Sequence, residues 1–61
     1  MNMTTADIQR LTKKGMFVVK INDKDMGISY RTRFTRDGAN EEVRYATRQC
    51  NQTATIVGCP K

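Results

Sequence analysis

The hydrophobic period of this chain changes once, at Asp37-Gly38, and the change fixes the type of two successive elements. Before it, every second residue belongs to a less polar set, and the residues between are polar, as in a half-buried strand. The less polar set is Ile28, Tyr30, Thr32 and Phe34. After it, small or apolar residues recur at the spacing of an amphipathic helix: Ala39, Val43, Ala46 and Cys50. The sequence therefore predicts a strand over 28–36. A helix follows, starting at Asp37 or at Thr35 and ending at Asn51.

Three further elements are predicted from local composition. Residues 16–21 are rich in β-branched and aromatic side chains and predict a strand with Phe17, Val19 and Ile21 on one face. The turn-forming residues 22–27 predict an antiparallel hairpin, and residues 53–57 predict a last strand. Near the N-terminus, Thr4 or Thr5 is expected to cap a short helix ending before Gly15.

This order predicts an α+β fold, with a small single-layer three-stranded sheet packed on one helix (ββαβ). The expected sheet order is 2-1-3 and antiparallel, because it places the apolar strand 16–21 in the centre and the arginine-rich strand at an edge. Residues 1–15 are expected to form an N-terminal helix or arm, and residues 16–61 the ββαβ domain. With 61 residues, we expect a single domain overall.

The charge of the chain points to a polyanionic or acidic partner. Its net charge is +5, with eleven basic and six acidic residues. No apolar run approaches the roughly 20 residues of a membrane span, and no secretory signal is visible. We therefore expect a complete small cytoplasmic protein with no membrane partner.

The residue types of the chain argue against a catalytic site and against a metal site. The chain has no histidine and two cysteines, too few for a zinc site or a disulfide framework. Cys50 falls on the helical stripe and is expected to be a small core residue. Both thiols are expected to be free in a reducing compartment, and the alternative is a bridge between Cys50 and Cys59 in an oxidising medium. No nucleophile lies beside a plausible base, so we expect no enzyme, no metal and no cofactor.

Two groups of basic residues are candidate binding sites. The alternation over 28–35 places Tyr30 and Phe34 toward the core and the intervening arginines on the opposite, helix-free face. The expected partner-binding site there consists of Met16, Val18, Lys20, Arg31, Arg33 and Arg36. Its apolar members are either an exposed anchor or covered by Ile8 and Leu11, and its arginines either bind a partner or form a solvated face. A secondary basic surface is expected on the far side of the molecule: Arg44, Tyr45 and Arg48.

The order of elements also resembles the small inhibitor of host RNA polymerase made by short-tailed coliphages. The residues concerned are Phe17-Val18-Val19-Lys20, Glu41-Glu42-Val43 with Ala46, Thr55-Ile56-Val57, and Cys59-Pro60-Lys61. The resemblance implies a protein that disables a host machine by occupying a surface. That family works with an acidic strand and with arginines on its last strand, whereas this chain has basic strands and no arginine after Arg48. Its polymerase contacts therefore do not carry over residue by residue.

Three functions follow as expectations. The first is a small, non-enzymatic, phage-type inhibitor of a host nucleic-acid-handling enzyme such as RNA polymerase, bound through an acidic surface. On this hypothesis, reversing the charge of Arg31 and Arg33 abolishes binding, and reversing that of Arg44 and Arg48 does little. The second is a nucleic-acid-binding domain using phosphate contacts. The third is a structural or assembly protein. The division of the arginines between two sides of the molecule places the protein partner ahead of nucleic acid.

Overall fold

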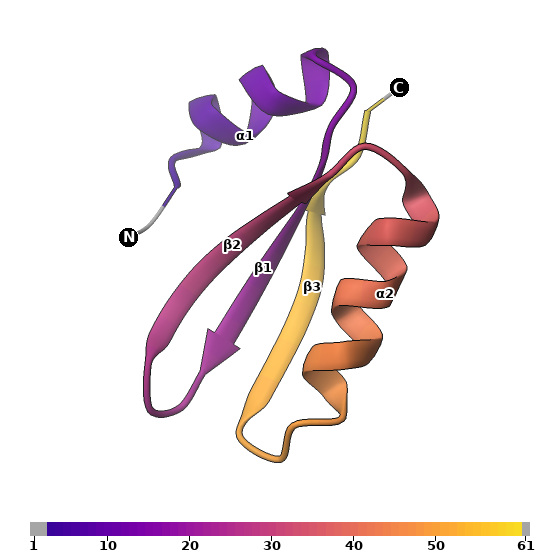
Figure 1. Cartoon of the computed structure of the whole chain (residues 1–61). Coiled ribbons are helices and arrows are strands. Elements are labelled where there is room, and N and C mark those ends of the chain that lie inside the picture. The colour runs from indigo at the N-terminus through magenta and orange to yellow at the C-terminus, as the bar shows by residue number, and fades with distance from the viewer. Residues whose placement is uncertain (1–2, 61) are drawn as a thin grey trace.

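Five regular elements follow one another in the computed structural model, which describes residues 3–60 (Figure 1). In chain order they are α1 (Thr5–Lys13), β1 (Phe17–Asp23), β2 (Gly27–Arg33), α2 (Arg36–Thr47) and β3 (Gln52–Gly58). The three strands form one antiparallel sheet in the order β2-β1-β3. The predicted α+β fold and sheet order are confirmed. The end of the Cys-Pro-Lys segment, Lys61, lies outside the described residues.

The two faces of the sheet are covered differently. Helix α2 packs mainly over β3 and β1, whereas α1 contacts β1 and β3 at one end of the sheet (Figure 1). The side chains of β1 alternate between these environments, because successive residues of a strand point to opposite faces. We call the two sides the α2 face and the open face.

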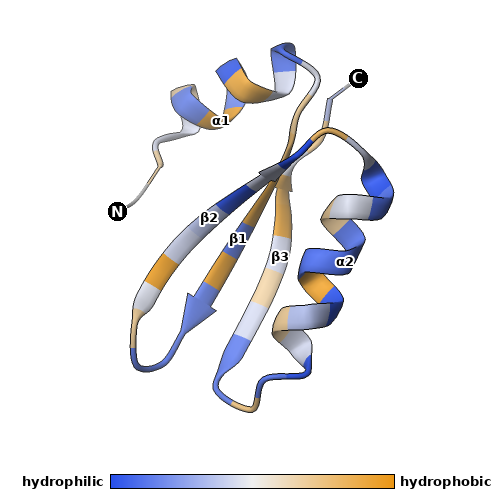
Figure 2. Ribbon diagram, in the orientation of Figure 1, coloured by the Kyte–Doolittle hydropathy of each residue, from blue (hydrophilic) through white to orange (hydrophobic). Residues whose placement is uncertain are grey.

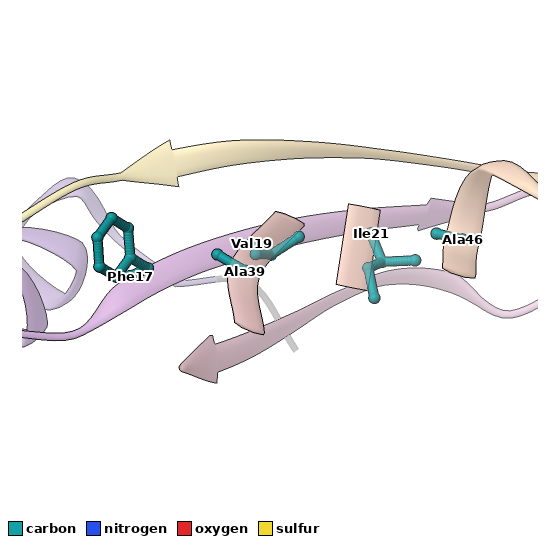
Figure 3. Close-up of a cluster of buried hydrophobic side chains, with 5 residues drawn as sticks. All are labelled: Phe17, Val19, Ile21, Ala39 and Ala46. Carbon is teal, nitrogen blue, oxygen red and sulfur yellow. The ribbon is translucent and has the colours of Figure 1, made fainter. Parts of the chain in front are cut away.

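The core lies between β1 and α2 (Figure 3). Five buried side chains form it: Phe17, Val19, Ile21, Ala39 and Ala46. The two alanines let α2 lie close to the sheet, and the partly buried side chains of Val43, Ala54 and Ile56 complete the cluster. Figure 2 shows the resulting contrast between hydrophobic segments of β1 and the mostly hydrophilic α2. Most of the apolar burial in this small domain therefore depends on one strand.

Both helices begin at a threonine that caps them. Thr4 and Asp7 form a capping box at the start of α1, and Thr35 Oγ1 accepts a hydrogen bond of 3.0 Å from the Gly38 amide. Helix α2 ends at Thr47, four residues before the predicted end. Cys50 therefore lies in the following turn and is exposed, so its assignment to the core was wrong. Cys59 is also exposed, and no disulfide joins the two cysteines.

The face assignment of β2 was also wrong. Val19 pairs with Arg31 and Phe17 with Arg33, and directly opposed residues share a face. Arg31 and Arg33 consequently belong to the α2 face, whereas Ile28, Tyr30 and Thr32 belong to the open face. The predicted core residue Phe34 follows the strand and is 74% exposed.

The hairpin turn explains this register. Only Lys24, Asp25 and Met26 separate the paired residues Asp23 and Gly27, and Gly27 has φ +86°. A three-residue loop followed by a left-handed glycine is a common hairpin connection, and it sets which residues of the two strands oppose each other. A change of one residue in this register would exchange the two faces of β2.

Helix α1 covers one end of the open face. A side-chain carbon added at Gly58 would lie 2.8 Å from Ile8 Cγ2, 2.9 Å from Thr12 Cγ2 and 3.2 Å from Val18 Cβ. Because glycine lacks that carbon, α1 approaches β3 closely, and Val18 is fully buried. Val18 was predicted to be either an exposed anchor or covered by the N-terminal helix, and the structure shows that it is covered.

Candidate functional site

Arg33 is held at the junction of β2 and α2. Its Nε donates a hydrogen bond of 3.0 Å to Glu42 Oε1, and its Nη2 forms an ion pair with the same oxygen. The Arg33 side chain passes beside Gly38, where an added side-chain carbon would lie 3.3 Å from Arg33 Cβ. The bare backbone of Gly38 and the carboxylate of Glu42 therefore fix the position of this arginine.

An open hollow of about 550 Å³ lies next to this ion pair. Its lining comes from β2 and from one side of α2: Arg33, Glu41, Glu42, Arg44, Tyr45 and Arg48. The helical members recur at three- and four-residue intervals, so they share one helix face. We call this feature the α2 hollow.

The α2 hollow brings together residues that are predicted from the sequence to lie on opposite sides of the molecule. Arg33 now lies beside Arg44 and Arg48, so the predicted separation of the two arginine groups was wrong. Tyr45 is 65% exposed, between two arginines in the chain. Within residues 3–60, neither Arg44 nor Arg48 forms an ion pair. Two cationic groups and an exposed aromatic ring are thus available to a ligand.

The other predicted site residues are distributed over several surfaces. Val18 is buried, Met16 is half-buried, and Lys20 lies opposite Tyr30 on the open face. The guanidinium of Arg36 lies 5.3 Å from the centre of the Phe17 ring, where it covers the end of the core. The six residues expected to form one partner-binding surface therefore do not lie together.

Two features of these surfaces were missed from the sequence. The Arg33–Glu42 ion pair requires β2 to turn its arginines toward α2, and the same register turns half-buried Tyr30 to the open face. The signal for both was present in Asp23 and Gly27, which are the ends of a three-residue hairpin loop.

A hydrogen-bond network joins the strands at one end of the sheet. Asp23 accepts hydrogen bonds from the side chain of Gln52 and the amides of Met26 and Asp25. These bonds hold the pKa of Asp23 below its ordinary value of 3.8, the Gln52 bond being the largest cause. The Asn51 side chain joins the network through Asp25 Oδ2. The network connects the β1–β2 turn to the start of β3 and is structural.

Residues 3–60 contain no group of three or more side chains of the types that bind metals. Neither described helix is long and apolar enough to cross a membrane.

Comparison with known proteins gave no match. No protein-family model, curated protein or solved structure is significantly similar to the chain. The site must therefore be interpreted from its own residues.

Proposed function

We propose that this chain is a non-enzymatic nucleic-acid-binding protein, and that the α2 hollow contacts a single strand. The observation that carries the proposal is the meeting of Arg33, Arg44, Arg48 and exposed Tyr45 around one hollow. Guanidinium groups bind phosphate oxygens, and an exposed aromatic ring is a platform on which a base stacks. A net charge of +5 favours the encounter with a polyanion.

The composition of the hollow favours a single strand over duplex DNA. Glu41 and Glu42 also line it, so it lacks the uniformly positive surface that follows the closely spaced phosphates of a duplex. A few phosphate contacts combined with stacking match the mode of sequence-tolerant single-strand binders. The expected binding is therefore modest in affinity and tolerant of sequence.

The test compares two charge-reversal variants in binding to a fluorescent single-stranded oligonucleotide at low salt. Arg44→Glu with Arg48→Glu is expected to weaken binding by at least about 100-fold, because two phosphate contacts become repulsive. The matched control is Lys13→Glu with Lys14→Glu, which changes the net charge equally at α1, on the other face of the sheet. Equal losses in the two variants would show that net charge alone acts, and the α2 hollow would be rejected.

A second candidate function is inhibition of a host enzyme through a protein–protein contact, as the phage-inhibitor resemblance implies. Phe34 favours this candidate, because its side chain is 74% exposed and it lies in the chain between Arg33 and Arg36. Aromatic and arginine side chains are frequent energetic centres of protein interfaces. Purified bacterial RNA polymerase is the direct probe. Phe34→Ala should weaken that complex and leave oligonucleotide binding unchanged, whereas no binding to the polymerase by the wild-type protein would contradict this candidate.

A further inference from the structure

The two edges of the sheet differ in charge. The β2 edge carries exposed Arg31 and Arg33, whereas β3 has the sequence QTATIVG, with neither charge nor proline. Exposed strand edges usually carry charges or proline, which oppose pairing with another chain. The arginines of β2 supply such a guard. The β3 edge has no charge, and its one irregularity is a bulge at Val57, where its pairing with β1 shifts by one residue.

The outer edge of β3 is also free within the described chain. In residues 3–60, the backbone of residues 53–58 makes no hydrogen bond to any element other than β1. Since β1 occupies one side of the strand, alternate amide and carbonyl groups are left for another strand. Val57, the unpaired residue of the bulge in β3, is 39% exposed.

The flank of α2 above this edge is uncharged over its middle. Gly38 and Glu42 face β2, as their contacts with Arg33 show. The opposite flank, toward β3, therefore carries Asn40 and Thr47 at helical spacing. Arg36 and Arg44 lie on either side of these two residues on the helix surface. Two copies joined along β3 would bring the neutral side chains of Asn40 and Thr47 closest to the second copy.

From these three observations we propose that the protein forms a symmetric dimer by antiparallel pairing of β3 with β3 of a second copy. A two-fold axis uses the same strand on both sides, and every residue from 52 to 58 is neutral, so no charge is buried or opposed in any register. The product is a six-stranded sheet. Its outer strands are the arginine-bearing β2 edges, which stop further growth.

A dimer also suits the small core of this chain. Only six hydrophobic side chains in the described residues are buried, and domains of this length are marginal alone. Adding strands to a three-stranded sheet increases both hydrogen bonding and apolar burial. The proposal is independent of the function proposed for the α2 hollow.

The test measures molar mass by sedimentation equilibrium from micromolar to millimolar protein, with enough salt to screen the net charge. The expected dimer has twice the 7.0 kDa mass of the chain. Thr53 and Thr55 are exposed open-face residues of β3, and antiparallel pairing places both beside the same face of the second copy. Thr53→Lys with Thr55→Lys should raise the dimer dissociation constant by more than about tenfold.

The control is Thr32→Lys, which adds one charge at an exposed open-face position on β2 and should leave the dimer intact. A second measurement needs no variant, since backbone hydrogen exchange of residues 53–57 should slow as the wild-type concentration rises. A monomeric wild type at every concentration overturns the proposal. A molar mass that rises beyond that of the dimer also overturns it. The same holds if Thr32→Lys raises the dimer dissociation constant as much as the β3 variant does.

Discussion

At the scale of single residues, the positions without side chains explain more of this molecule than the charged ones. Gly27 sets the register of β2, Gly38 admits Arg33 to the edge of α2, and Gly58 admits α1 to the sheet. From the sequence alone, a glycine indicates only where a helix or strand ends. Its role at these three places is to permit a contact or a backbone conformation, which only spatial neighbours reveal.

The hydrogen bonds to Asp23 predict a pH dependence of stability. Its pKa is lowered in the folded protein by hydrogen bonds to the ionised carboxylate. Its stabilising effect is therefore complete above the unfolded pKa and is lost as pH falls through the lower, folded value. Asp23→Asn should reduce the melting temperature at neutral pH, and the difference from wild type should shrink as pH falls below about 4.

Thermal unfolding followed by circular dichroism across this pH range gives the measurement. Glu41→Gln provides the control, since Glu41 is exposed and makes no hydrogen bond within residues 3–60 through its side chain. If the Asp23 variant melts like wild type at neutral pH, the network does not stabilise the fold.

At the scale of elements, the position of a strand was predicted correctly where its hydrophobic pattern allowed only one interpretation. The apolar strand 16–21 has large side chains on both faces, and the centre of a sheet is the natural place for it. In β2, by contrast, two interpretations are possible, because either Ile28 and Tyr30 or Arg31 and Arg33 can lie on the α2 face. The hairpin register places the arginines on the α2 face, where Arg33 pairs with Glu42 of α2.

Helix α1 offers the sharpest prediction at this scale. Gly58→Ala places a carbon 2.8 Å from Ile8 Cγ2, so α1 must move away from Val18 or the sheet must distort. We expect a destabilisation of about 1–3 kcal/mol, typical of overpacking, together with faster hydrogen exchange in α1. Adding Ile8→Ala should recover part of the lost stability, since it removes the nearest clashing group. A strictly additive double variant would show that the two residues do not compete for this space.

At the scale of the whole molecule, the fold class followed from the sequence but the charge distribution did not. The order β2-β1-β3 could be predicted from the single assumption that the most apolar strand is central. The distribution of arginines depended on a single register, and reversing it moved two of them from the helix-free face to the side of α2. That change is why nucleic acid now precedes a protein partner among the proposed functions.

Salt dependence is the measurement that tests this charge distribution as a whole. Arg44 and Arg48 are unpaired within residues 3–60, and Arg33 is shared with Glu42, so two or three phosphates should be neutralised per hollow. For a single strand this predicts a slope of log affinity against log salt between about −1.4 and about −2.1. Affinity should then fall by about 7-fold to about 18-fold between about 50 mM and about 200 mM salt.

The proposed dimer adds a length dependence to that prediction. An oligonucleotide long enough to reach both hollows should show about twice the slope of a short one, because twice as many counterions are released. Thr53→Lys with Thr55→Lys should abolish this difference between long and short strands, whereas Thr32→Lys, which adds charge at the other edge of the sheet, should preserve it. If long and short strands give equal slopes while wild type is a dimer, the two hollows do not act on one strand. The dimer would then stand, and binding would be confined to a single α2 hollow.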